Sequence, residues 1–136
     1  LVDAASMDLI RRPEEFDVLV TSNLFGDVVT DVAAIVTGSM GLAPSANRNV
    51  DGSYPSMFEP VHGAAFDITG MGIANPLGTV LAGSMMLDGL GETAAATALW
   101  DAVETQLADP DAPRTADIGG SAGTEDVIAD LDRRLG

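Results

Sequence analysis

The chain has 136 residues, 46% of them hydrophobic, so it is long enough to bury one ordinary core. Its formal net charge is −15 and it contains no lysine, so its surface repels nucleic acid and anionic membranes. The absence of cysteine excludes disulfides and thiolate metal sites.

We interpret the acidic surface as an adaptation to high cytoplasmic salt, where dense counterions screen like charges from one another. An acidic face that binds a protein partner is the alternative interpretation. The longest apolar stretches stay below about 20 residues, and no basic segment of the kind that opens a signal peptide is present. We therefore expect a cytoplasmic protein without a nucleic-acid or membrane partner.

The first two predicted elements are a helix and a strand. The helix covers Val2–Arg12 and stops ahead of Pro13, and Asp3 lies in its first turn, where the helix dipole favours negative charge. The residues Phe16–Thr21 predict a strand, and a turn at Gly26 joins it to the next helix. That order places the following acids beyond the carboxyl end of a strand, where open α/β sheets bind ligands.

Two acids stand four residues apart in the helix that follows. Asp27 and Asp31 therefore project from one helix face, where like charges cost an isolated helix about 0.2–0.5 kcal/mol. A hard cation such as Mg²⁺ would offset the repulsion, because it accepts one or two carboxylates and leaves positions open for a substrate. Such a pair can equally be a solvated face near a helix N-terminus. By itself the spacing leaves both interpretations open.

The stretch Phe58–Pro76 is rich in glycine, alanine and proline, which predicts a long ordered loop. Small side chains at residues 63–65 would let backbone N–H groups approach a phosphate closely, although the G-x-G-x-x-G pattern of Rossmann folds is absent. His62 is the only histidine, and it could stack on a nucleotide or form a hydrogen bond with it. A structural role for this residue is the alternative.

Three further helices are predicted after the loop. The run Leu77–Leu90 is apolar nearly all round, which predicts a buried helix with Met85 and Met86 in the core. A more amphipathic helix should cover Glu92–Ala108 around the single tryptophan, and the last should run from Thr124 to Leu135. We expect Ser121 or Thr124 to cap that last helix at its N-terminus.

Two motifs give the chain a family resemblance. The first consists of Asn23, Phe25, Gly26, Asp27, Thr30 and Asp31 followed by Gly38-Ser39-Met40-Gly41, and the second is Glu59-Pro60-Val61-His62-Gly63. Together they resemble the metal-dependent, NAD(P)-linked β-decarboxylating dehydrogenases, which include the isocitrate, 3-isopropylmalate, tartrate and D-malate dehydrogenases. The resemblance runs along essentially the whole chain and covers the C-terminal part of that family's sequence.

The resemblance implies a fold and a division into domains, whereas length alone predicts a single domain. The implied fold is α/β, as a C-terminal fragment of the isocitrate/isopropylmalate dehydrogenase fold, which is not a Rossmann fold. Residues 1–41 would end the smaller substrate and dimerisation domain. Residues 42–136 would form the C-terminal part of the larger, nucleotide-binding domain.

The resemblance also implies ligands for particular residues. Asp27 and Asp31 would bind Mg²⁺ or Mn²⁺, and Asp3 would complete the metal site from the other subunit of a homodimer. The metal would bind the substrate's 2-hydroxyl and adjacent carboxylate and assist both oxidation and loss of CO₂. The residues on the family's cofactor positions are Glu59, His62, Gly63, Ala65, Asp67, Ile68, Asn75 and Asp117. Of these, Asp67 favours NAD over NADP, because a carboxylate accepts a hydrogen bond from a ribose 2′-hydroxyl and repels a 2′-phosphate.

The resemblance limits the choice of substrate less than it limits the choice of cofactor. The loop 47–58 looks more like the tartrate and D-malate dehydrogenases, so the expected substrate is a 2-hydroxy dicarboxylic acid of the malate type. A 3-isopropylmalate dehydrogenase is the alternative. The family's catalytic tyrosine and lysine and its substrate-binding arginines precede this segment, so no catalytic residue is assigned here. The alternative from another class is an inactive truncated piece or an acidic binding module.

Overall fold

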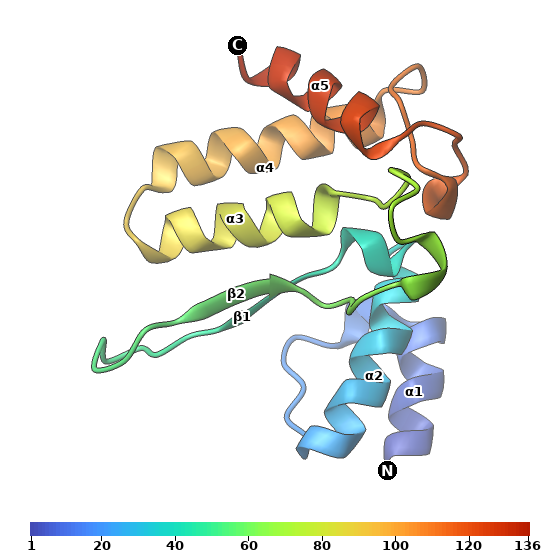
Figure 1. Cartoon of the computed structure of the whole chain (residues 1–136). Coiled ribbons are helices and arrows are strands. Elements are labelled where there is room, and N and C mark those ends of the chain that lie inside the picture. Colours follow the sequence, from blue (N-terminus) through green and yellow to red (C-terminus); the bar gives the residue numbers. More distant parts are fainter.

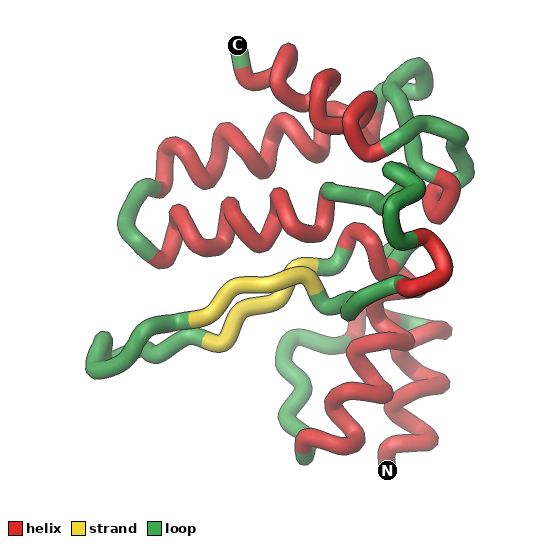
Figure 2. Tube along the Cα trace, in the orientation of Figure 1, coloured by secondary structure: helices red, strands yellow, loops and turns green.

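A computed structural model describes all residues, 1–136. It is an α/β structure of five main helices and one two-stranded hairpin, and Figure 2 shows that all strand structure lies in this hairpin. The helices α3, α4 and α5 lie above the hairpin in Figure 1, and the pair α1 and α2 lies below it. The elements are α1 (Val2–Arg11), α2 (Asn23–Val36), β1 (Pro44–Asn47), β2 (Met57–Pro60), α3 (Leu77–Gly89), α4 (Thr93–Ala108) and α5 (Thr124–Leu135).

The helix α1 confirms the first predicted element and ends two residues before Pro13. Proline has a fixed φ and no N–H to donate, so the helix does not continue through it. α1 packs against α2, and the buried side chains of the two helices are Leu9 on α1 and Val29 and Ala34 on α2. The two helices thus form a small layer of their own below the hairpin (Figure 1).

The predicted strand at Phe16–Thr21 is wrong for this structure. The segment is irregular, and the side chains of Val18 and Val20 are 83% and 92% exposed. A strand needs a neighbouring strand to satisfy its backbone groups, and none of the other residues lies beside this segment as one. The turn predicted at Gly26 is also wrong, because α2 begins at Asn23 and the Gly26 N–H donates to the Ser22 carbonyl at 2.8 Å.

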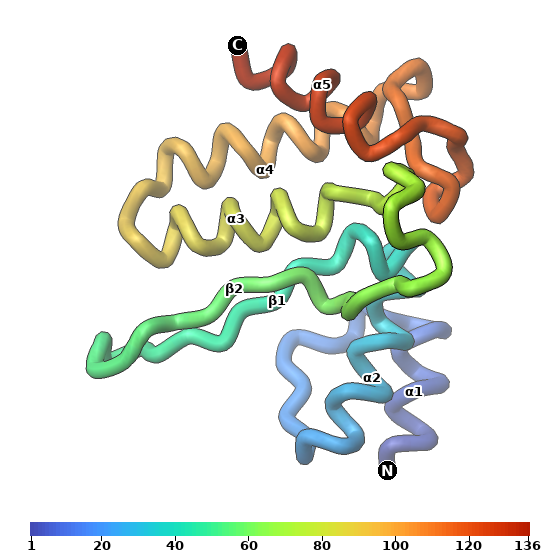
Figure 3. The backbone as a smooth tube through the Cα atoms, viewed as in Figure 1, coloured from blue at the N-terminus to red at the C-terminus, as the bar shows by residue number.

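The hairpin occupies part of the region that the sequence predicts as loop. β1 and β2 pair antiparallel, with Pro44 opposite Pro60 and Asn47 opposite Met57. The first three residues of the predicted loop therefore belong to β2. The loop also contains a 3-10 turn at Phe66–Ile68. The hairpin packs on α3 and then extends past the end of this contact as a long arm (Figure 3).

The main core lies between α3, α4 and α5. It consists of Leu77, Leu81, Ala102, Val103, Val127 and Leu131. α3 and α4 run side by side, and α5 packs on α4, so the three predicted C-terminal helices are confirmed (Figure 1). The placement of the methionines in the core is wrong in part, because Met86 is 42% exposed and Met85 is half-buried.

The N-terminus of α5 also differs from the prediction. Gly123 occupies the capping position, and its N–H donates to the Asp126 carboxylate at 3.0 Å. Ser121 lies outside the helix, and the Thr124 hydroxyl donates instead to the carbonyl of Ala74 at 2.6 Å. The hydroxyl thus ties α5 to the end of the predicted nucleotide loop rather than capping its own helix.

Ion pairs fasten the end of the chain to α4. The Arg134 guanidinium binds Asp109 and Asp130, each at 2.7 Å, and Gln106 donates to Asp130 at 2.9 Å. The hydrogen bond from Arg134 holds the pKa of Asp130 below its usual range, against the opposing effect of burial. None of the helices is both long and apolar enough to cross a membrane.

Two glycines of α3 make a matched test of this packing. A Cβ at Gly78 would lie 2.8 Å from the carbonyl oxygen of Gly41, so Gly78→Ala should lower the free energy of unfolding by about 1–3 kcal/mol. A Cβ at Gly83 would meet no atom within 4 Å, so Gly83→Ala should raise it by about 0.5–1 kcal/mol. Urea unfolding of both variants measures the difference. Equal stabilities would contradict the close approach of α3 to residue 41.

Candidate metal and nucleotide site

The helix α2 presents two free acids to solvent. Asp27 and Asp31 lie one turn apart and are both exposed. All five ion pairs of the chain use Arg12, Arg133 or Arg134, so neither acid is neutralised by an arginine. The hydroxyl of Thr30, which lies between them in sequence, donates to the Gly26 carbonyl at 2.9 Å. The donor chemistry of the two acids therefore fits a hard cation.

One of these acids shares a hollow with the nucleotide segment. Asp27 and Glu59 both line a concavity of about 380 Å³ between the start of α2 and the base of the hairpin. Its other lining residues are mostly polar and include Ser22, Asn23 and Ser45. The fold thus brings a predicted metal ligand and a predicted cofactor residue to one place, although they are far apart in sequence. Asp31 is not among the lining residues.

The third predicted metal ligand does not join the first two. Asp3 is exposed on α1, and no three Asp, Glu or His side chains in the chain form a group able to hold a metal ion. The sequence assigns Asp3 to a neighbouring subunit, so this separation within one chain is compatible with the prediction. The assignment itself stays a prediction.

The middle of the predicted nucleotide loop is exposed. The side chain of Asp67 and the residues Gly63 and Ala65 are open to solvent, and Ile68 is half-buried at the end of the 3-10 turn. The His62 ring is half-buried: its Nδ1 lies 3.2 Å from the Gly63 carbonyl oxygen, and its Nε2 is buried without a hydrogen-bond partner. Buried polar atoms are normally paired, so a ligand that bonded Nε2 would remove an unfavourable state. This observation fits a polar ligand at the loop.

Both ends of the loop are fastened by the backbone. At its start the Val61 N–H donates to the Ala43 carbonyl at 2.9 Å, next to the hairpin. Near its end the Thr124 N–H donates to the Gly72 carbonyl at 2.8 Å. Between these anchors every hydrogen bond joins residues of the loop that are no more than four positions apart. The loop can therefore adjust in its middle while its ends stay in place.

Two predicted cofactor residues have their side chains occupied by hydrogen bonds within the chain. The Asp117 carboxylate accepts hydrogen bonds from Asn75 Nδ2 at 2.9 Å, from Thr115 Oγ1 at 2.5 Å and from the hydroxyl of Ser39. The Asn75 Oδ1 accepts from the Leu77 N–H at 3.0 Å, at the start of α3. A ligand contact through either side chain would compete with these bonds. The cofactor role of the two residues stays a prediction.

The same hydrogen bonds set the charge state of Asp117. Burial raises the pKa of the carboxyl, but the bonds from Ser39, Thr115 and Asn75 outweigh it and lower the pKa below its usual range. Ser39 is the site residue that the sequence did not assign to any role. The signal was present, because Ser39 lies in the Gly38-Ser39-Met40-Gly41 motif, but nothing local connects it to residue 117.

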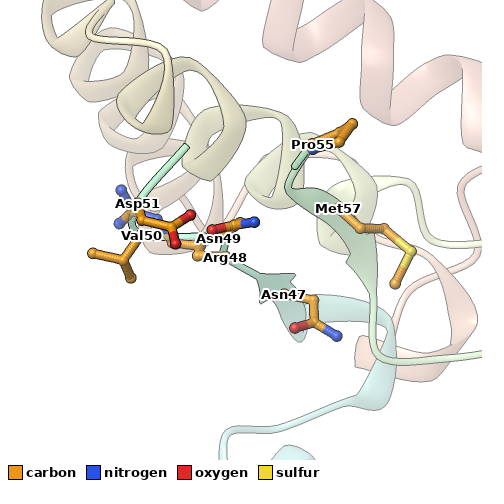
Figure 4. Close-up of a pocket in the computed structure, with 7 residues that line it drawn as sticks. All are labelled: Asn47, Arg48, Asn49, Val50, Asp51, Pro55 and Met57. Carbon is orange, nitrogen blue, oxygen red and sulfur yellow. The ribbon is translucent and has the colours of Figure 1, made fainter. Parts of the chain in front are cut away.

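A larger hollow lies away from all of these residues. It has a volume of about 550 Å³ and is formed by the arm of the hairpin, and Figure 4 shows its seven lining residues. They include Arg48 and Asp51, but none of the predicted metal or cofactor residues. Size alone therefore does not identify the functional site of this chain.

The comparisons with known proteins agree with the two motifs. A sequence profile of the isocitrate/isopropylmalate dehydrogenase family matches residues 1–131. The chain belongs to this family. It is 48% identical over 134 residues to a probable tartrate dehydrogenase/decarboxylase of Bacillus subtilis (strain 168), and 50% identical over 129 residues to a 3-isopropylmalate dehydrogenase of Streptomyces griseus subsp. griseus.

The solved structures extend the family membership to the fold. A crystal structure of isocitrate dehydrogenase from Methylococcus capsulatus superposes with a TM-score of 0.92 at 41% sequence identity, and the match covers 98% of this chain and 39% of that one. The fold is therefore that of isocitrate/isopropylmalate dehydrogenase family members. The chain matches 37% of the length of the Bacillus protein and 35% of the Streptomyces protein.

Proposed function

We propose that this chain supplies the metal-binding and nucleotide-binding segments of an NAD-dependent, divalent-metal-dependent dehydrogenase. The reaction is oxidative decarboxylation of a 2-hydroxy dicarboxylic acid. The observation that supports this proposal best is the hollow shared by Asp27 and Glu59. It places a carboxylate suited to a cation beside the strand that leads into the nucleotide loop, and hydride transfer needs substrate and cofactor side by side.

Each segment has a defined part in this proposal. Asp27 and Asp31 hold Mg²⁺ or Mn²⁺ on the exposed face of α2, and Asp3 of a second copy in a homodimer completes the set. The cation supplies Lewis-acid stabilisation to the substrate's hydroxyl and carboxylate oxygens. Glu59 faces the same hollow and orients the nearby end of the cofactor, while the half-buried His62 offers its unpartnered Nε2 as a hydrogen-bonding atom.

The substrate follows the malate type in this proposal, with tartrate or D-malate ahead of 3-isopropylmalate. The sequence feature behind this order is the long connection at residues 47–58, which forms the arm of the hairpin. The relatives support either choice, since a probable tartrate dehydrogenase and a 3-isopropylmalate dehydrogenase match at similar identity. An activity on small organic acids also agrees with a proposed cytoplasmic location and with a surface that repels nucleic acid.

The deciding experiment is a dehydrogenase assay on the longest form of the protein that its gene encodes. NADH formation at 340 nm should require Mn²⁺ or Mg²⁺ and one of three acids: D-malate, tartrate or 3-isopropylmalate. The acid with the highest kcat/KM identifies the branch. The alternative is an inactive piece or an acidic binding module, and it predicts no turnover and no nucleotide binding by calorimetry.

Asp67 provides a test of cofactor choice. The wild-type protein should prefer NAD, because the exposed carboxylate accepts a hydrogen bond from the ribose 2′-hydroxyl and repels a 2′-phosphate. Asp67→Lys should lower the NAD/NADP ratio of kcat/KM about tenfold or more, since the hydrogen bond to the 2′-hydroxyl of NAD is lost and an ion pair with the 2′-phosphate of NADP replaces a repulsion. Asp101→Lys, which changes an exposed acid on α4, is the matched control and should leave the ratio unchanged. An unchanged ratio in Asp67→Lys would remove this residue from the role.

A further inference from the structure

The segment that leaves α2 is joined to the end of the nucleotide loop by a single carboxylate. Asp117 Oδ2 accepts from the Ser39 hydroxyl and from Asn75 Nδ2, so one oxygen connects residues that belong to the two binding segments. Ser39 is 5% exposed and Asn75 is 9% exposed, whereas Asp117 is an exposed residue, so the two bonds join buried donors to a partly buried carboxylate. The connection spans 78 residues of sequence on one side and 42 on the other.

The surrounding backbone leaves little freedom at this point. A Cβ on Gly41 would lie 2.7 Å from Asp117 Oδ2 and 2.9 Å from Asn75 Cβ, so only a glycine lets the carboxylate come this close to the chain. Ser39 also accepts the Gly41 N–H at 2.9 Å through the same hydroxyl oxygen. The Ser39 hydroxyl thus donates one hydrogen bond and accepts another, which fixes its rotation. Asn75 is fixed in the same way by the Leu77 N–H at the start of α3.

We infer that Asp117 is a positioning residue that couples the metal-binding helix α2 to the nucleotide loop through Ser39 and Asn75. It acts through its neighbours Ser39 and Asn75. The carboxylate sets where the loop ends relative to the segment that leaves α2. The part of this inference that concerns nucleotide affinity rests on the proposed function. The part that concerns the loop itself does not.

The test compares two buried serines. Ser39→Ala removes one donor to Asp117, and Ser84→Ala removes a hydroxyl of similar burial that donates to the Ala96 carbonyl at 2.8 Å between α3 and α4. Ser39→Ala also loses the bond that the hydroxyl accepts from the Gly41 N–H, whereas Ser84→Ala loses one bond, and only the first variant involves the Asp117 carboxylate. Amide hydrogen exchange of ligand-free protein should show the Leu77 N–H exchanging about threefold to tenfold faster in Ser39→Ala and unchanged in Ser84→Ala.

A second variant and a second readout complete the experiment. Asp117→Asn keeps the shape of the side chain and removes its charge, and it should accelerate exchange at Leu77 at least as much as Ser39→Ala does. In the presence of Mn²⁺ the Kd for NAD should rise about threefold to tenfold in Ser39→Ala relative to Ser84→Ala. The inference would be overturned if exchange at Leu77 were unchanged in both Ser39→Ala and Asp117→Asn. It would also be overturned if Ser84→Ala accelerated this exchange as much as Ser39→Ala does. A wild-type protein that binds no NAD would contradict the proposed function, and the exchange result would still decide the role of Asp117.

Discussion

Asp27→Asn and Asp31→Asn should each abolish metal-dependent turnover and weaken Mn²⁺ binding by about 100-fold or more. Replacing a residue that merely orients a metal ligand already costs about 10–100-fold in affinity, and these residues are proposed as the ligands themselves. Both side chains are exposed on α2, and an amide removes the repulsion between them, so the fold should be preserved or slightly stabilised. Isothermal calorimetry with Mn²⁺ and circular dichroism measure the two properties separately.

The chain offers a matched control for this prediction. Asp132 is an exposed acid on the helix α5, far in sequence from the hollow, and Asp132→Asn changes the net charge by the same amount. It should leave Mn²⁺ affinity within twofold of the wild type. If Asp132→Asn weakened binding as much as Asp27→Asn, the effect would come from the general negative field of a chain with net charge −15. Wild-type affinity in both α2 variants would remove the metal site from this helix.

The helices were predictable because their causes are local. The apolar spacing and the stop ahead of Pro13 are sufficient to predict α1, α3 and α4 to within a few residues. The strand predicted at 16–21 is absent because its cause is not local. Alternating apolar residues describe a segment able to form a strand, whereas a strand exists only when a second one lies beside it.

The candidate site was predictable in its parts and not in its arrangement. Spacing alone places Asp27 and Asp31 on one face of a helix, and the structure agrees. No period or spacing connects Asp27 with Glu59, or Ser39 with Asp117, because these pairs meet only through the packing of the hairpin and α3. The family resemblance supplies part of that information, since it assigns Asp27 to a metal and Glu59 to a cofactor that must lie side by side.

The lower layer of the structure leaves apolar side chains in water. Ile10 on α1 is 63% exposed, and Leu24 and Val28 on α2 are 72% and 53% exposed. Burying such side chains contributes about 25 cal/mol per Å² of apolar area, so this layer gains stability if a second copy covers it. If a twofold pairing through α1 and α2 placed Asp3 of one copy beside the acids of the other, it would do so twice, because an isologous interface makes two equivalent shared sites.

Subunit mixing should show that Asp3 crosses between the copies. Asp3→Asn and Asp27→Asn should each be inactive as homodimers, because every site then lacks one acid. After the two are mixed and allowed to exchange subunits, about a quarter of wild-type activity should return: half of the dimers are hybrids, and each hybrid has one intact site of two. This prediction is motivated by the separation of Asp3 from Asp27 and Asp31, which do not form one metal-binding group within a single chain.

The control for subunit mixing uses two acids of the same helix. Asp27→Asn mixed with Asp31→Asn should recover no activity, since both residues lie on α2 and every hybrid site then lacks one of them. Native mass spectrometry establishes that hybrids have formed in both mixtures. If Asp3→Asn and Asp27→Asn hybrids form and stay inactive, then Asp3 serves the site of its own chain or none. Recovery in the control mixture would show instead that the two acids of α2 act in different sites.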